Sequence, residues 1–277
     1  MSSNIFMEWL AFRCLGADKI RLSSYSRYES NLKFVNGCKC SHSVYKAAPF
    51  TLSLYEVPFM NSLIKVNCWN LNVYLTFAEK QYFLERNPDI TVRPVKDDVV
   101  FDLGGCFGDT SLAFASAVGK YGHVYCFEPL PRHQDIIRAN LNLNPDLAQT
   151  ITLVPNAVSS VHKAQLNFKD GGAGSQFGDG EVQVVTCTID DFVCEQNIKK
   201  LNFIKFDIEK AELAAIEGGM SSILKFRPKL AVSVYHGNQY LDVIPFLINN
   251  LPNYNFYLET HTIHKEEAVL YCSPCKV

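Results

Sequence analysis

Acidic residues and glycines stand at the ends of short apolar runs in this chain. Asp102 precedes Gly104 and Gly105 at the end of one run, and Glu128 and Asp207 close two later runs. Glycine lets the backbone turn sharply and approach a ligand without a Cβ in the way. An acid at the end of the second strand can accept hydrogen bonds from the hydroxyls of a ribose. This ordered set predicts an adenosyl ligand.

The spacing of the glycines distinguishes between adenosyl ligands. A dinucleotide site has the pattern Gly-x-Gly-x-x-Gly and offers a helix N-terminus to a pyrophosphate. Residues 102–109 instead read DLGGCFGD. Asp109 at the helix start would repel a pyrophosphate, but it suits the cationic sulfonium and ammonium groups of S-adenosylmethionine. S-adenosylmethionine is therefore the expected cofactor, and a nicotinamide-dependent oxidoreductase is disfavoured.

Three side chains near strand ends are candidates for the proton transfer that methylation of a hydroxyl requires. Asp207 and Glu209 follow one predicted strand, and His236 ends the next. The ordinary histidine pKa of about 6.5 suits a general base, so His236 is the predicted base. A hydrogen-bonded structural histidine is the alternative at that position. Asp207 is expected to orient the cofactor's ammonium group or the acceptor, whereas Glu209 would also stabilise a first helical turn.

Metal chemistry is not predicted, although two arrangements deserve a test. Asp207 and Glu209 could hold Mg²⁺ against the acceptor hydroxyl. Two local cysteine pairs, 38 with 40 and 272 with 275, could supply four thiolates to zinc, but the first spacing is too short for the usual pattern. We expect the ten cysteines to be reduced and mostly packed as small apolar side chains.

The elements that would position these residues alternate from about residue 97 onward. Short β-rich runs and longer helical stretches follow one another, as in βαβ units with a mostly parallel sheet. Strands are predicted at 99–103, 123–127, 151–158, 202–206 and 229–235, and helices at 109–119, 132–143, 209–217 and 240–251. Two antiparallel hairpins are predicted, from runs 163–168 with 181–188 and runs 255–259 with 268–272. The glycine-rich loop 169–180 is either a flexible tip or a cover over substrate.

The predicted sheet brings the acidic residues together. In an open α/β sheet, ligands bind beyond the carboxyl ends of the strands, where the strand order reverses. If the order is the usual doubly wound one, the first and fourth strands are neighbours. Asp102 and Asp207 then face each other across one crevice.

Composition limits the class of protein. Of 277 residues, 48% are apolar and 19% are charged, which excludes a disordered chain. The net charge of −2 provides no field that would recruit nucleic acid. The apolar stretch 5–15 is broken by Glu8 and Arg13, so we expect no signal peptide and no membrane span. We therefore expect a cytoplasmic location. Residues 1–96 lack the alternation of strands and helices and are predicted to form a mixed appendage, possibly substrate-binding, with a helix near 77–86. Residues 97–277 are predicted to form the second domain, which binds the cofactor.

Three ordered segments resemble the signature blocks of the FkbM family of S-adenosylmethionine-dependent methyltransferases. They are VFDLGGCFGDT at 100–110, VYCFEP at 124–129 and NFIKFDIEKAE at 202–212. The resemblance runs from about Leu71 to the terminal hairpin. It implies a class I methyltransferase fold, a Rossmann-like α/β sheet of seven mostly parallel strands with an antiparallel terminal strand. Carried over by position, the cofactor residues are Asp102, Gly104, Gly105, Phe107, Gly108, Thr110, Glu128, Asn156, Ala157 and Asp207.

Two positions depart from the family pattern. Lys210 stands where the third block normally has glycine, and Cys106 replaces the middle glycine that many class I enzymes have. A side chain at Cys106 is tolerable if its φ stays negative. The resemblance implies O-methylation of a hydroxyl on a sugar, a glycan or a natural product. A non-catalytic adenosyl-binding protein is the alternative, which Lys210 keeps open, and the oligomeric state is not predicted.

Overall fold

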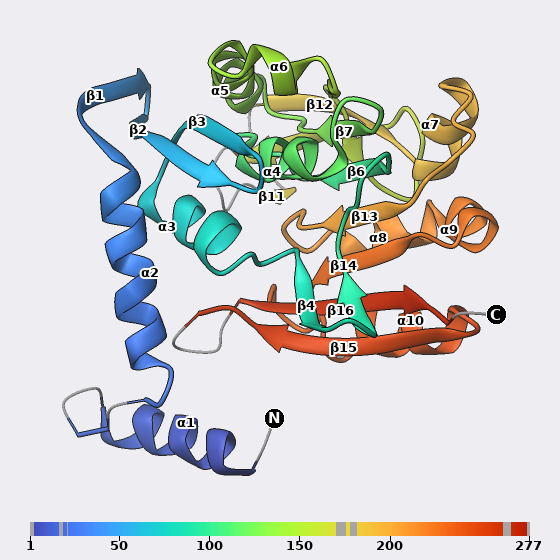
Figure 1. The fold of residues 1–277 in the computed structure, drawn as a ribbon. Coiled ribbons are helices and arrows are strands. Elements are labelled where there is room, and N and C mark those ends of the chain that lie inside the picture. Colours follow the sequence, from blue (N-terminus) through green and yellow to red (C-terminus); the bar gives the residue numbers. More distant parts are fainter. Residues whose placement is uncertain are drawn as a thin grey trace.

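A computed structural model describes residues 3–16, 19–20, 22–169, 176–177, 182–262 and 267–275. Its largest sheet has seven strands in the order β15-β16-β14-β13-β6-β7-β8 (Figure 1). The strands are β6 (Val99–Leu103), β7 (His123–Phe127), β8 (Ile151–Val154), β13 (Phe203–Phe206), β14 (Lys229–Ser233), β15 (Tyr254–Thr260) and β16 (Ala268–Pro274). The first five are parallel, and β16 pairs antiparallel with both β14 and β15. The predicted class I sheet is confirmed.

Helices cover both faces of this sheet. Successive residues of a strand point to opposite faces, so Phe203 joins one apolar core and Ile204 joins the other. One core includes residues of α4 (Asp109–Val118) and α5 (Pro131–Asn142), with the short α6 (Pro145–Ala148) nearby. The other includes residues of α7 (Ile189–Glu195), α8 (Glu212–Glu217), α9 (Met220–Phe226) and α10 (Val243–Asn250). Two buried layers leave the carboxyl ends of the strands free for a site.

The predicted strand 151–158 is two strands in the structure. Pro155 lacks a backbone N–H, so the ladder ends at β8, and β9 (Ala157–Val158) joins another sheet. That sheet has the order β11-β10-β12-β9 and contains the predicted hairpin, β10 (Gln165–Lys169) with β12 (Val182–Cys187), whose antiparallel pairing is confirmed. The two-residue β11 (Gln176–Phe177) pairs with β10. The rest of the glycine-rich loop lies outside the described residues.

Two predicted helices differ from the structure. The helix predicted from residue 209 begins only at Glu212, because Glu209 (φ +54°) and Lys210 (φ +80°) are left-handed and cannot continue a right-handed helix. The helix predicted at 77–86 is wrong. The helical part lies earlier, in α3 (Asn70–Asn72) and the π-helix η1 (Val73–Ala78). Strand β4 (Leu84–Asn87) follows and pairs with β5 (Ile90–Val92).

The N-terminal part packs directly against the large sheet's helices. It contains α1 (Ser3–Leu15), α2 (Tyr25–Cys38) and the antiparallel strands β1 (Lys39–Ala47), β2 (Phe50–Phe59) and β3 (Ser62–Cys68). Helix α2 runs along one side and α1 lies at its far end (Figure 1). Val57 and Ile64 share one core with Phe114 of α4, so the core is continuous across residue 96. Within the described residues, no helix is long and apolar enough to span a bilayer.

Candidate active site

A cavity of about 340 Å³ lies at the carboxyl ends of the central strands. Strands β6 and β13 are adjacent and parallel, with Asp102 opposite Lys205 and Leu103 opposite Phe206. The loops that follow them therefore meet across the cavity, as the predicted strand order requires. Of the predicted site residues, the cavity is lined by Gly104, Gly105, Thr110, Glu128, Asn156, Ala157, Asp207 and Glu209.

The glycine loop after β6 is shaped by close contacts. A Cβ on Gly104 (φ +88°) would lie 2.0 Å from the carbonyl oxygen of Asp207, and one on Gly105 would lie 2.3 Å from the Cys126 Sγ. Only glycine fits at these two positions. A side chain at Cys106 would be free of strain only with a negative φ, and its φ in the structure is +47°, so the condition is not met. Its backbone N–H donates to the Glu128 Oε2 at 2.8 Å, which holds the strained turn in place.

Asp102 lies behind the cavity and is fully buried. It accepts hydrogen bonds from the hydroxyls of Thr110 (2.7 Å) and Ser111 (2.6 Å), and its Oδ1 lies 3.1 Å from the Lys205 Nζ. Burial opposes the charge on Lys205, but the carboxylates of Asp102 and Asp207 outweigh it and raise the pKa of Lys205. Lys205 also donates to the Gly104 carbonyl at 2.6 Å. The pair thus supports the glycine loop from beneath.

Glu128 lines the cavity directly after strand β7. Its Oε1 accepts the Leu130 N–H at 3.0 Å and lies 3.3 Å from the Nδ1 of His133, which is itself buried. Phe107 and Gly108, also predicted cofactor residues, do not line the cavity. Phe107 packs behind it, 5.0 Å between ring centroids from Trp69. The contacts with Leu130 and His133 hold Glu128 in one orientation at the edge of the cavity.

The N-terminal part, predicted to be an appendage that possibly binds substrate, supplies one wall of the cavity. Asp109, interpreted from sequence as a partner of the cationic cofactor, lines the cavity and accepts hydrogen bonds from Asn72 (3.2 Å) and Thr76 (2.6 Å). Burial raises the pKa of Asp109. The wall's lining residues are Trp69, Leu71, Asn72, Leu75, Thr76, Gln81 and Tyr82. Asn72 and Thr76 are four residues apart, and this spacing could have indicated from sequence that both side chains lie on one face.

Asp207 faces the glycine loop from the other side of the cavity. Its Oδ2 accepts the Tyr82 hydroxyl at 2.9 Å and its Oδ1 accepts the Tyr235 hydroxyl at 3.2 Å. Two phenols therefore fix the orientation of the carboxylate. Glu209 lines the cavity beside it, and burial raises the pKa of Glu209 to about 7, with Asp207 adding to the rise and His236 opposing it.

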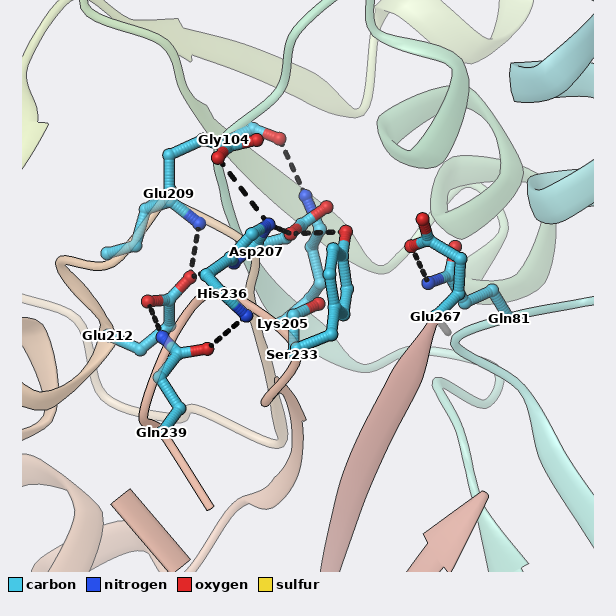
Figure 2. A network of polar contacts seen from close by, with 12 residues as sticks. Gln81, Gly104, Lys205, Asp207, Glu209, Glu212, Ser233, His236, Gln239 and Glu267 are labelled. Atoms are coloured by element: carbon cyan, nitrogen blue, oxygen red, sulfur yellow. Dashed lines mark hydrogen bonds and ion pairs between the residues drawn. The ribbon is translucent and has the colours of Figure 1, made fainter. Parts of the chain in front are cut away.

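His236 lies just behind these two carboxylates (Figure 2). Its Nε2 is 3.5 Å from the Glu209 Oε2 and 3.9 Å from the Asp207 Oδ1, and its Nδ1 is 3.3 Å from the Glu212 Oε1. Burial lowers the pKa of His236, but these carboxylates outweigh burial and raise it to about 9. The imidazole is therefore protonated at neutral pH. The prediction of His236 as a base rested on an ordinary pKa, and the structure removes that premise.

The cluster around His236 also has the residue types of a metal site. One ligand atom from each of Asp207, Glu212 and His236 lies within 4.8 Å of the others. However, Glu212 already accepts the Ile208 N–H at 2.9 Å and a hydrogen bond from Gln239. A carboxylate with these donors fits an ion-pair network, and we assign no metal to it. All ten cysteines are free thiols, and Cys272 is fully buried.

Comparison with solved structures finds several similar chains. A methyltransferase FkbM from Methylobacillus flagellatus KT matches with a TM-score of 0.52 and 22% identity, over 73% of this chain and 52% of that chain. The chain thus spans about half the length of that relative. An Aeropyrum pernix fibrillarin with natively bound S-adenosyl-L-methionine matches at 0.46 and 13%, over 83% and 97% of the two chains. An rRNA methylase from Streptococcus thermophilus matches at 0.42 and 12%, over 66% and 90%.

Sequence comparison identifies the family. None of the curated proteins matches the chain. The profile of the methyltransferase FkbM domain matches residues 102–258, which is more than half of the chain and includes both loops that face the cavity. The chain therefore belongs to the FkbM family of S-adenosylmethionine-dependent methyltransferases, as its three sequence blocks predicted.

Proposed function

We propose that this chain transfers a methyl group from S-adenosylmethionine to a hydroxyl of a sugar, a glycan or a natural product. One observation carries the proposal. The cavity has the glycine loop and Glu128 on one side and the carboxylates of Asp207 and Glu209 on the other. A cofactor site and a proton acceptor would then share one cavity.

The shape of the glycine loop fits the cofactor. A Cβ at Gly104 or Gly105 would collide with its surroundings, so the loop keeps bare backbone along the cavity. Glu128 would hold the ribose, Asn156 and Ala157 would lie by the adenine, and Asp207 would face the ammonium group. Bound there, S-adenosylmethionine supplies an electrophilic methyl group on its sulfonium.

Glu209 is the best placed general base. Its carboxylate lines the cavity, and its pKa of about 7 matches the pH at which a base must both accept and release a proton. In this scheme the acceptor hydroxyl loses its proton to a carboxylate oxygen of Glu209 as the new bond forms. His236 stays protonated behind it and fixes its direction. Such general-base assistance typically contributes about 10²–10⁴-fold.

The backbone at Lys210 supports an active enzyme over a protein that only binds the cofactor. Lys210 has a φ of +80°, the left-handed conformation that glycine adopts without strain. The loop between β13 and α8 therefore keeps the course that a glycine would allow. The departure from the family pattern changes a side chain and leaves the loop's path in place.

Cofactor binding followed by methyl transfer tests the proposal. Isothermal titration with S-adenosylmethionine should show one site, and radiolabelled cofactor should label members of a panel of sugars, glycosides and polyketide alcohols. Glu209→Gln should lower kcat by about 10²–10⁴-fold and leave cofactor affinity nearly unchanged. Glu56→Gln, which removes an exposed carboxylate paired with Lys65, is the matched control. A protein that binds no cofactor at millimolar concentration contradicts the proposal.

A further inference from the structure

A buried carboxylate lies directly behind the cavity, at the first residue of α8. The Glu212 residue is 0% exposed, and Glu212 does not line the cavity. Its Oε1 accepts the Ile208 N–H at 2.9 Å and faces the His236 Nδ1 at 3.3 Å. Its Oε2 accepts a hydrogen bond from the Gln239 side chain. Figure 2 shows this chain of contacts leading from Gln239 through Glu212 toward His236.

Gln239 closes the network on its other side. Its Oε1 accepts the backbone N–H of His236 at 2.9 Å, and the residue is only 4% exposed. One amide therefore holds both the backbone of His236 and the carboxylate that faces its ring. The contacts join the loop after β13 to the loop after β14, the two loops that carry Asp207, Glu209 and His236.

This arrangement exceeds what helix capping needs. A carboxylate that only capped α8 would remain near water, whereas Glu212 has given up its hydration completely. A buried carboxylate is strongly unfavourable unless a cation and hydrogen-bond donors compensate it. His236 is the group that can supply the cation. Burial of Glu212 and the charge on His236 therefore depend on each other.

The other charges around His236 come from several elements. Asp207 and Glu209 face its Nε2 from the loop after β13, and Glu267 at the start of β16 also interacts with it electrostatically. Lys210 approaches from the same loop as Glu209, with its Cε 3.9 Å from the position of a Cβ on Gly237. Acidic groups outnumber basic ones in this set. A fixed cation at His236 therefore helps to balance Asp207 and Glu209.

We propose that Glu212 and Gln239 are positioning residues of the methyl transfer, which hold His236 as a fixed cation so that it orients Glu209 toward the acceptor. The inference rests on the proposed function in the role that it gives to Glu209. Neither residue contacts the cavity, so neither is a catalytic residue. In Glu212→Gln the ring loses its buried counter-ion, and His236 becomes neutral at a lower pH than in the wild type. The cation that orients Glu209 is then lost at a lower pH than in the wild type.

NMR titration of the full chain tests the network without any acceptor. The His236 ring signal is assigned by its loss in His236→Gln. Wild-type His236 should titrate at about pH 9. In Glu212→Gln the midpoint should fall by about one pH unit or more, the usual effect of losing an adjacent charge partner. Glu259→Gln, which removes a carboxylate paired with Arg86 outside the network, should leave it unchanged. An unchanged midpoint in Glu212→Gln, or an equal fall in Glu259→Gln, overturns the proposal.

The pH dependence of kcat supplies the second readout. In the wild type, kcat should decline on the alkaline side as His236 loses its proton at about pH 9. This falling limb should move to lower pH in Glu212→Gln, and Glu212→Asp should restore part of the shift. KM for the cofactor should change little. Gln239→Leu, which keeps volume and removes both hydrogen bonds, covers the case in which Glu212→Gln does not fold, and it should also lower the His236 midpoint. A wild-type chain that binds the cofactor but methylates nothing contradicts the proposed function, while the NMR midpoint still decides the network.

Discussion

Two opposite walls of the cavity differ in how their charged side chains are paired. On the glycine-loop wall, Asp102 and Lys205 are buried and paired, and two hydroxyls donate to the Asp102 Oδ2. On the opposite wall, Glu209 and Glu267 have raised pKa values, caused first by burial and then by neighbouring charges. The charges of the first wall are held in a buried ion pair, whereas Glu209 on the second wall has a pKa of about 7 and is close to its titration point at neutral pH.

This difference separates two tasks. A cofactor site needs fixed backbone groups, and a charge pair sealed behind it keeps the loop in one shape. A proton acceptor must change its charge within the physiological pH range, so it needs a carboxylate whose pKa is raised toward 7. Substitutions in the glycine-loop wall should therefore change stability and cofactor affinity. Substitutions in the opposite wall should change the pH dependence.

The largest effect is expected from Lys205→Met. The substitution leaves Asp102 as a buried, uncompensated charge, and removal of one member of a buried pair usually costs about 3–5 kcal/mol. The free energy of unfolding, measured by urea denaturation at neutral pH, should fall by this amount. A loss below about 1 kcal/mol would show that water reaches Asp102 and that the first wall is not sealed.

His236 should make stability pH-dependent. Its pKa is raised to about 9 in the folded chain, against about 6.5 when unfolded. Its contribution, about 3 kcal/mol, is fully present below about pH 6.5 and is lost as pH rises through about 9. Unfolding free energies measured across this range should fall in the wild type and stay nearly flat in His236→Gln. Similar slopes in the two proteins would mean that the charge on His236 does not stabilise the fold.

Glu128→Ala should weaken cofactor binding. The substitution removes the acceptor for the Cys106 and Leu130 N–H groups and the proposed partner of the ribose. Hydrogen bonds to a charged group contribute about 1.5–3 kcal/mol, so calorimetry should show roughly 10- to 150-fold lower affinity. Asp135→Asn, which removes an exposed partner of Arg138, should bind normally. Unchanged affinity in Glu128→Ala would place the ribose elsewhere.

The smallest effect is expected from Lys65→Met, the surface counterpart of Lys205→Met. Lys65 and Glu56 are 3.0 Å apart, with 43% and 42% of their side chains exposed. Exposed pairs contribute about 0–1 kcal/mol, so the urea midpoint should barely move. A loss as large as that of Lys205→Met would contradict the idea that burial gives the first wall its importance.

The local pattern of apolar and turn-forming residues was sufficient to predict much of the fold. Strands β6 and β7 have the predicted bounds, because five-residue apolar runs ended by glycine or proline have few other structures open to them. The π-helix η1 was not predictable from pattern, because its residues have the periodicity of an ordinary helix. Lys205 was also missed, although a lysine inside an apolar strand, in register with Asp102, is a usable signal of a buried pair.

The sequence by itself determined the order of the elements, the glycine loop and the acids at the strand ends, since each depends on residues only a few positions apart. The tertiary structure alone decided the charge on His236, the partners of Asp109 and the wall that residues 69–82 form. These features depend on groups distant in the chain: Thr76 lies 33 positions from Asp109, and Glu212 lies 24 from His236. A pKa reflects burial and neighbouring charge, and only folding brings those neighbours together.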